Sequence, residues 1–333
     1  MDGLLFRSAE ELFTRHATPE AVRAIRAGGP ASALWGEIEA SGFLEALVPE
    51  EAGGAGIGPP EILPVLLAAG RFALPLPIAE TMLARAALVA TGETPPEGAI
   101  ALAEPAGEHM ARLAPGQPAD WVLLPQGETA LLLPWDKAEP DTDASSALAD
   151  LLRWPAGTGR SLACPDLLAA GAWAEVAIMA GAMERILEDT VRHARDRQQF
   201  GRPIAAFQAI QQQISVLTED VFASRMAAQL ASVPDGKGIA GLNPTRIATA
   251  KLRVGEAAVR VCAIAHAVHG AMGITEELDL HLLTARLQVG RMRFGGEAHW
   301  AHWLGRQFLA GDLTETLAFV RAHLGPVAPE ATA

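Results

Sequence analysis

Near its C-terminus the chain carries a run of chemically active side chains, RMRFGGEAHW, which spans residues 291–300. Two arginines and a phenylalanine precede Gly295 and Gly296, and Glu297 and His299 then fall in what we expect to be the first turn of a helix. A carboxylate at a helix N-terminus is stabilised as an anion, which keeps Glu297 ionised but makes it a weaker base. The spacing of this acid and imidazole matches neither a hydrolase nor a metal site. We interpret Glu297 as a helix-capping acid, and the imidazole and indole groups after it as packing groups.

The composition is that of a soluble globular protein. With 333 residues, half of them apolar, the chain is long enough for two or three domains around a large core. No apolar stretch has the length to span a bilayer, and the N-terminus lacks the layout of a signal peptide, so we expect a cytoplasmic protein without membrane insertion. A formal charge of −13 argues against binding to nucleic acid. Cys164 and Cys262 lack metal-ligand or redox spacing and should pack as small hydrophobic residues.

The apolar pattern divides the chain into a helical region, a small β region and a second helical region. Apolar residues recur at three- and four-residue spacing up to about Val89, interrupted by a glycine-rich loop at residues 48–60. Short apolar runs broken by proline and glycine then indicate strands. We predict an N-terminal helical domain at residues 1–96, a truncated β domain at 97–163, a helix-bundle domain at 164–325 and a tail at 326–333.

The bundle domain should contain four long helices. One apolar stripe between Trp173 and Gln198 predicts the first helix. Asn243 as N-cap and Pro244 as first helical residue should open another helix, which ends near Gly270. Thr275 is expected to cap a short helix. Long helices joined by short loops favour an antiparallel bundle. The stripe residues are Val176, Met179, Ala180, Met183, Ile186, Leu187 and Val191.

Four motifs, in this order, carry a resemblance to a known family. They are LVPEEAGGAGIG from Leu47, ALAEP at residues 101–105, RDRQQFGRPIAAFQAIQQQI at residues 195–214 and HGAMGITEE from His269. The third is the most specific, since it follows the pattern R-x-x-F-G-x-x-I-x-x-F-Q-x-x-Q. Over nearly its whole length the chain resembles the acyl-CoA dehydrogenase family. The resemblance implies a mainly α fold with a small β domain: an N-terminal helical domain, a truncated middle β domain and a C-terminal four-helix bundle.

The resemblance also implies FAD as the cofactor. A guanidinium three residues before an aromatic ring offers a fork for a pyrophosphate and a flat face for adenine. The alternative is that this arginine only pairs with an acid and that the ring belongs to the core. Two glycines further on would let the backbone approach the cofactor, or simply end a helix. By resemblance, the residues that contact the ADP half of a FAD held mainly by a neighbouring subunit are Arg197, Gln199, Phe200, Phe207, Ile210, Gly270 and Gly273.

The family reaction removes the α and β hydrogens of an acyl-CoA thioester. A carboxylate takes the α proton while the flavin receives a hydride from the β carbon. The family places this base at either of two positions, which here are Gly295 and Gly171. The catalytic base is therefore unassigned, and its weak candidates are Glu175, one turn beyond Gly171, Glu277 and Glu297. The motifs G-S-D and W-x-T-N, which cover the flavin ring in the family, are also missing after ALAEP.

These losses favour a short subunit of a heteromeric acyl-CoA dehydrogenase. The partner would be a full-length paralogue that carries the base and most of the flavin site, and the acyl group would come from fatty acid or steroid catabolism. An electron-transfer flavoprotein or a similar acceptor would take the electrons. Three alternatives remain: a self-sufficient homo-oligomer (dimer or tetramer) with a relocated glutamate base, a flavin-dependent monooxygenase on the same fold, and a non-catalytic structural subunit.

Overall fold

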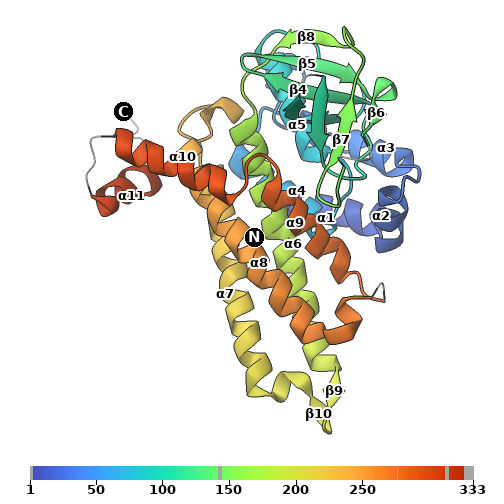
Figure 1. The fold of residues 1–333 in the computed structure, drawn as a ribbon, viewed down its shortest axis with the longest axis vertical. Helices are drawn as coiled ribbons and strands as arrows, with labels where there is room; N and C mark the ends of the chain where they lie inside the picture. Colours follow the sequence, from blue (N-terminus) through green and yellow to red (C-terminus); the bar gives the residue numbers. More distant parts are fainter. Residues whose placement is uncertain (1–2, 108, 142–144, 276, 312–314, 326–333) are drawn as a thin grey trace.

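The computed structural model describes residues 3–107, 109–141, 145–275, 277–311 and 315–325 (Figure 1). A group of helices and a β domain lie together at one end of the molecule, and a long helix bundle extends from them. The predicted fold class, mainly α with a small β domain, is confirmed. The tail predicted at 326–333 lies outside the described residues.

Five helices form the N-terminal region: α1 (Leu4–His16), α2 (Pro19–Arg26), α3 (Ser32–Ala40), α4 (Pro59–Arg71) and α5 (Ile78–Ala90). The Thr18 hydroxyl caps α2 by accepting from the Ala21 amide at 3.3 Å, and Pro19 fits the first turn because it needs no hydrogen-bonded N–H. Short 3₁₀ turns at Phe43–Glu45 (η1) and Glu50–Ala52 (η2) fill the link to α4. The middle of α4 and nearly all of α5 are buried.

The β domain consists of two four-stranded sheets. One has the order β1 (Ile100–Leu102), β4 (Trp121–Gln126), β5 (Thr129–Pro134) and β8 (Arg160–Ala163), and only its β1–β4 pair is parallel. The other has the antiparallel order β2 (Glu104–Gly107), β3 (Met110–Leu113), β7 (Asp150–Arg153) and β6 (Glu139–Pro140). A 3₁₀ turn, η3 (Trp135–Lys137), separates β5 from β6. Small and branched side chains from both sheets pack around the buried Trp154.

The bundle is built from α6 (Leu168–Asp196), α7 (Gln208–Ser232), α8 (Pro244–His269) and α9 (Leu280–Met292). The Asn243 cap is confirmed, because its side chain accepts from the amides of Thr245 and Arg246. The cap predicted at Thr275 is wrong: its hydroxyl donates to the Met272 carbonyl, and the next helix begins only at Leu280. Two further helices, α10 (Glu297–Ala310) and α11 (Thr316–Leu324), reach away from the bundle (Figure 1).

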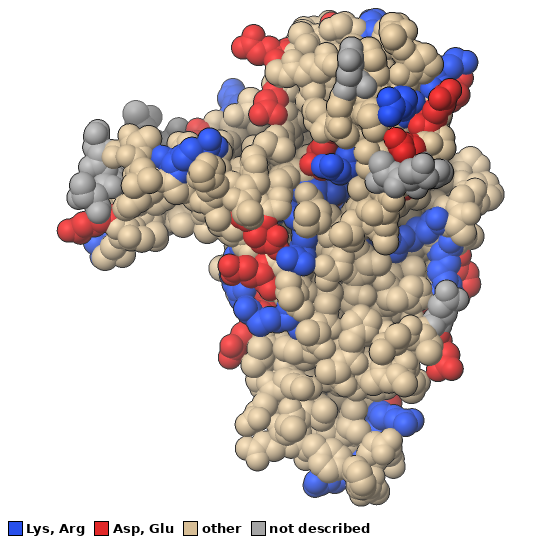
Figure 2. Space-filling model, in the orientation of Figure 1, with Lys and Arg blue, Asp and Glu red and all other residues tan. Residues whose placement is uncertain are grey.

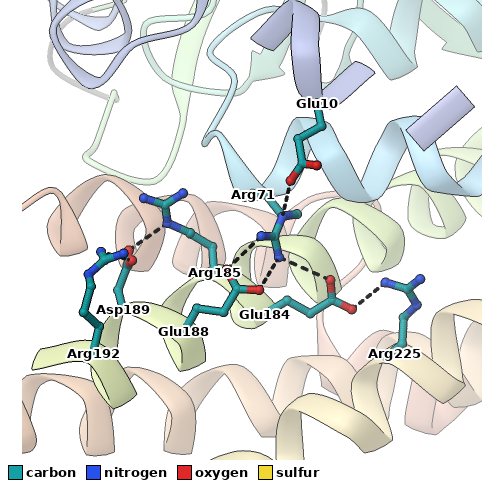
Figure 3. A network of polar contacts seen from close by, with 8 residues as sticks. All are labelled: Glu10, Arg71, Glu184, Arg185, Glu188, Asp189, Arg192 and Arg225. Atoms are coloured by element: carbon teal, nitrogen blue, oxygen red, sulfur yellow. Dashed lines mark hydrogen bonds and ion pairs between the residues drawn. The ribbon is translucent and has the colours of Figure 1, made fainter. Parts of the chain in front are cut away.

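Helix α6 is the centre of the molecule and contacts α4, α5, α7, α8 and α9. It packs so closely on α4 that a Cβ on Gly70 would lie 1.9 Å from the Ile178 carbonyl oxygen, and one on Gly181 would lie 1.9 Å from that of Leu67. The predicted apolar stripe is buried between Val176 and Ile186. The opposite edge of α6 is charged. There Arg71 of α4 binds both Glu188 carboxylate oxygens at 3.0 and 2.8 Å and lies within ion-pair distance of Glu10, Glu184 and Glu188 (Figure 3).

No helix within the described ranges combines the length and the apolarity needed to cross a membrane. Both cysteines are buried as free thiols, as the sequence predicts. Burial raises the pKa of Cys164 and of Cys262 to about 11, so both thiols stay protonated near neutral pH. Helix α9 ends at Met292, and the residues after it contact the β domain, because Arg293 and Phe294 form hydrogen bonds with Leu102 and Glu104.

Candidate functional site

The RMRFGGEAHW run forms a tight turn between α9 and α10. Phe294 has a left-handed φ of 52° and Gly295 one of 87°. The Phe294 amide donates to Glu104 of β2 at 3.0 Å, and the Trp300 indole donates back to the Phe294 carbonyl at 3.0 Å. The turn is therefore fixed on both sides, and it positions the buried Phe294 ring between the β domain and α6.

Both positions at which the family would place a base are closed by neighbouring side chains. A Cβ on Gly171 would lie 2.6 Å from the Phe294 ring, and one on Gly295 would lie 2.7 Å from the His299 ring and 2.9 Å from the Trp300 indole nitrogen. Contacts under 3.0 Å are essentially absent from real structures, so even alanine at Gly171 would displace Phe294. Neither glycine leaves room for a glutamate.

A buried ion cluster lies beside this closed position. The Arg293 guanidinium binds Glu80 of α5 at 2.5 Å, lies 3.3 Å from Glu175 of α6 and donates to the Leu102 carbonyl at 2.8 Å. Arg286 of α9 forms a second ion pair with Glu175 at 2.8 Å. Glu80 and Glu175 are 6% and 2% exposed, and Arg293 is 4% exposed. The cluster joins α5, α6, α9 and β1.

The cluster binds the Glu175 carboxylate too strongly for it to act readily as a base. Burial alone would raise its pKa, but the positive charges of Arg286 and Arg293 outweigh burial and hold the pKa of Glu175 below its ordinary value. A general base works best with a pKa near the operating pH. Glu175 occupies the neighbourhood that its sequence position predicts, one turn from Gly171, yet its charge is already neutralised by two guanidiniums.

Glu297 begins α10, as the sequence predicts, and it is also paired. Its carboxylate accepts from Arg291 at 2.7 Å, and its side chain fills the space beside Gly255 of α8. Lys251 lies next to this pair, 1% exposed, and donates to the carbonyls of Gly290 and Arg291. Burial lowers the pKa of Lys251 to about 8, although Glu175 and Glu297 oppose the shift. Lys251 thus closes the C-terminal end of α9 by satisfying its last carbonyls.

Glu277 lies away from the other two candidate acids. It is exposed in the link before α9 and borders a separate cavity together with His269 and Asp279. The structure thus brings Glu175 and Glu297 to the two ends of one network around α9, and leaves Glu277 outside it. His299 is exposed and stacks edge-on against Trp300 at 5.0 Å between ring centroids, and Trp300 in turn packs against Trp303.

The predicted FAD contacts gather at the opposite end of α6. Gln199 and Phe200 belong to a hairpin, β9 (Gln198–Gln199) and β10 (Arg202–Pro203), which ends in the turn η4 (Ile204–Ala206). Phe200 is 91% exposed and has a φ of 52°. Arg197 is also exposed, and within the described part of the chain its guanidinium has no hydrogen-bond or ion-pair partner. An unpaired guanidinium and an open aromatic face fit the diphosphate and the adenine of a dinucleotide.

The remaining predicted contacts support this tip from behind. Phe207 and Ile210 pack on a small core cluster with Val268, two residues before Gly270. The Arg202 guanidinium stacks on the Phe207 ring at 4.2 Å, and that ring meets Phe200 edge-on. Gly270 has a φ of 61° and lies exposed after α8, while Gly273 is buried against His269. The two motifs are thus neighbours in the structure.

The tip and the closed base position are far apart. From Gly171 to Arg197 the chain advances 26 residues along α6, which corresponds to about 39 Å at 1.5 Å per residue. Figure 1 places the β9–β10 hairpin at the end of the bundle remote from the β domain. One dinucleotide does not span this length, so the tip and the Gly171 position would not serve one and the same bound cofactor.

The junction of the β domain and the bundle is a poor fit for a flavin ring. A cavity of about 620 Å³ lies there, bordered by β1, β2, the β4–β5 turn and the start of α6. Its charged lining residues are Glu104, Glu128 and Asp166, all acids, and the other lining side chains are apolar. A flavin needs hydrogen-bond donors at its polar edge, which carboxylates do not supply. The side chains at the tip therefore fit the ADP half of FAD better than the side chains lining this cavity fit its ring.

Sequence reasoning missed the members of the ion cluster other than Glu175. Glu80 and Arg85 stand in α5, which is otherwise almost wholly apolar and buried. A charged residue on such a helix must find a partner, because an unpaired buried charge is strongly unfavourable. That signal could have indicated a buried ion pair for Glu80. Its partner Arg293, 213 positions further on, has no local signal.

Comparisons with known proteins show the family of the chain. A family model described as acyl-CoA dehydrogenase, C-terminal domain, matches residues 158–301. The chain is 33% identical over 293 residues to the acyl-CoA dehydrogenase IpdE2 of Mycolicibacterium smegmatis, which covers 85% of this chain and 91% of the relative. The IpdE2 of Mycobacterium tuberculosis is 31% identical over 294 residues, with 85% and 89% covered.

Solved structures share the fold at lower identity. A chain of the ChsE4-ChsE5 complex from Mycobacterium tuberculosis superposes with a TM-score of 0.77 at 23% identity, over 93% of this chain and 97% of that one. A chain of the steroid acyl-CoA dehydrogenase Tcur3481-Tcur3483 gives a TM-score of 0.75 at 22% identity, over 92% and 97%. With relatives above 30% identity along most of its length, this chain belongs to the acyl-CoA dehydrogenase family.

Proposed function

We propose that the chain is a subunit of a heteromeric, FAD-dependent acyl-CoA dehydrogenase, and that it does not supply the catalytic base. The enzyme as a whole carries out α,β-dehydrogenation of an acyl-CoA thioester. The observation that carries the proposal is the pairing of a closed base position, with Phe294 against Gly171, and an open cofactor tip at Arg197 and Phe200. A self-sufficient enzyme needs both a catalytic base and a complete cofactor site.

The closed end argues that proton abstraction belongs to the partner. Glu175 is paired with two arginines and Glu297 with one, so both acids lack the free carboxylate that takes an α proton. The cavity next to Glu175 measures about 50 Å³, which is too small to enclose an acyl chain. A full-length paralogue would bind the acyl-CoA, carry the base and hold the flavin ring.

The open end defines what this chain contributes. Arg197 would pair with the diphosphate of the partner's FAD, Phe200 would stack on its adenine, and Gln199 would add a side-chain amide. FAD supplies the hydride acceptor when bound, and an electron-transfer flavoprotein or a similar acceptor would reoxidise it. The similar solved structures include a two-component complex and a steroid enzyme, which favours a paralogous partner and a bulky, steroid-derived acyl group.

The experiment is to purify the chain alone and again together with a co-expressed full-length paralogue, and to measure flavin by visible absorbance and its bleaching by acyl-CoA. We expect a colourless lone chain and a yellow complex that bleaches. Arg197→Ala in this chain should strip flavin from the complex, whereas Arg195→Ala, at an exposed neighbour that precedes the R-x-x-F-G pattern, should not. A lone chain that is yellow and bleaches would refute the proposal, and would direct attention to Glu277 and the other acids.

A flavin content unaffected by Arg197→Ala, in a complex that still forms and bleaches, would favour a purely structural subunit. The same preparations therefore separate three of the readings that the sequence leaves open.

A further inference from the structure

A small cavity beside the ion cluster has an unusual lining. It measures about 50 Å³, room for a few water-sized groups, and lies between α2, the α4–α5 link, α6, α9 and the segment after β3. Most of its wall is apolar. The charged and amide groups on the wall are Arg26, Glu80, Gln117, Glu175, Arg286 and Arg293. With three arginines against two carboxylates, the lining carries one excess positive charge.

Several polar atoms on this wall lack a hydrogen-bond partner. Among the described residues, they are Gln117 Oε1, Glu175 Oε2, Arg286 Nη1 and Arg293 Nε. The Arg286–Glu175 pair is close in distance but is not aligned as a hydrogen bond, so both of its atoms retain unused capacity. Gln117, Glu175 and Arg293 are each at least nine-tenths buried. Buried polar groups are almost always satisfied. The two arginine nitrogens are donors, which an anion in the cavity would satisfy, whereas Gln117 Oε1 and Glu175 Oε2 are acceptors, which need a donor such as water.

The surroundings of Arg26 indicate that a molecule in the cavity would carry a negative charge. In the described part of the chain it has no carboxylate partner, and its one hydrogen bond is a long one, 3.4 Å, to the Leu282 carbonyl. Burial, and then the positive charge of Arg286 nearby, lower the pKa of Arg26. Two guanidiniums thus face one cavity and repel each other. An anion between them would relieve this repulsion and use their planar donor forks.

We propose that this cavity is a binding site for a small carboxylate, held between Arg26 and Arg286. A carboxylate group matches the guanidinium fork in shape, and its size suits the cavity. The source is either a free small acid such as acetate or the carboxylate end of a longer acid that enters past Arg286, whose side chain is 15% exposed. The site goes beyond the proposed dehydrogenase role and does not depend on it, since binding needs neither flavin nor catalysis.

The test uses the purified full chain, or its complex if the lone chain does not stay soluble. The melting temperature and the heat of binding are measured with sodium acetate and with sodium hexanoate, each against sodium chloride at equal ionic strength. Acetate should raise the melting temperature saturably above chloride. Tighter binding of hexanoate would assign the site to the end of a longer acid, and binding of acetate alone would assign it to a free acid.

Two variants on the same helix complete the design. Arg26→Gln should weaken acetate binding at least tenfold and still fold, because it removes a guanidinium that has no acidic partner. Arg23→Gln removes the neighbouring arginine, which pairs with Glu20 and Asp279 outside the cavity, and should leave acetate binding unchanged. Equal effects of acetate and chloride, or full acetate binding by Arg26→Gln, would mean that the cavity holds only water and would overturn the proposal.

Discussion

The buried ion cluster should make Arg293 one of the most sensitive positions in the chain. Replacing it by methionine keeps much of the side-chain volume and removes the charge. Glu80 would lose its 2.5 Å partner, Glu175 would lose one of its two arginines, and the Leu102 carbonyl would lose a donor. Among the described residues, Glu80 would keep the Leu102 backbone amide and the Gln117 side-chain amide as hydrogen-bond donors, at 2.6 and 3.0 Å.

The size of the effect follows from the burial of the cluster. Removing one partner of a buried ion pair costs about 3–5 kcal/mol, because a charge is left without compensation in a medium of low dielectric constant. Replacing Arg293 together with Glu80 and Glu175 is milder, since no buried carboxylate is then left without its guanidinium; Arg286 loses its partner Glu175, but its side chain is 15% exposed and can be hydrated. We therefore expect Arg293→Met to lose about 4 kcal/mol of unfolding free energy, and the triple variant Glu80→Gln, Glu175→Gln, Arg293→Met to recover at least half of that loss.

Urea unfolding, followed by tryptophan fluorescence and by far-ultraviolet circular dichroism, measures these free energies wherever the two transitions coincide. Arg185→Met is the matched control. Its ion pair with Asp189 is on the surface, with the Arg185 side chain 37% exposed, so its loss should cost at most about 1 kcal/mol. If Arg293→Met is as stable as this control, or if the triple variant is less stable than Arg293→Met, the buried ion cluster does not contribute to stability in the way proposed.

Three further outcomes are expected. Gly171→Glu should not create flavin-bleaching activity in the lone chain. It should lower the unfolding free energy by about 1–3 kcal/mol through overpacking against Phe294, and by more because a charge is buried. Visible bleaching would contradict the conclusion that Phe294 closes the position at Gly171. Phe200→Ala should change the unfolding free energy by less than about 0.5 kcal/mol while flavin retention by the complex falls; unchanged flavin absorbance would exclude the stacking role. The folded-state pKa of Lys251, about 8, lies below its ordinary value of 10.5, so between these pH values the unfolded chain binds more protons than the folded one. The unfolding free energy should therefore rise with pH, by up to about 1.4 kcal/mol per pH unit, in the natural chain and not in Lys251→Met. Urea midpoints that change with pH in the same way in both proteins would disprove this.

Local rules predicted much of the fold. Asn243 followed by Pro244 carries the chemistry of a helix start, and α8 begins there. The stripe around Met179 and Met183 has a helical period and is buried in the longest helix. The prediction of a helix cap at Thr275 was wrong because a threonine hydroxyl can equally form a hydrogen bond within a turn, as that of Thr275 does by donating to the Met272 carbonyl.

The candidate site was harder to predict because its contacts connect distant segments. Glu175 could be placed one turn from Gly171 by counting, but its environment is set by Arg286 and Arg293, more than a hundred residues later. No periodicity in a sequence records which buried charges meet. The prediction for Arg197 and Phe200 needed only local information, because the two residues lie three positions apart, at the end of α6 and in the turn of the hairpin.

The asymmetry of α6 bears directly on the choice between a homomer and a heteromer. Suppose that two copies of this chain associated so that the tip of each reached the other. Phe200 and Arg197 would then be presented to a subunit whose ring cavity is lined by acids and whose base position is filled by Phe294. Each tip would bind half of a cofactor for which the other copy has no suitable ring site. We therefore expect the tip, whose Arg197 has no partner among the described residues, to bind beside a different subunit that has an open ring site. A stable homodimer that retains two flavins would contradict this expectation.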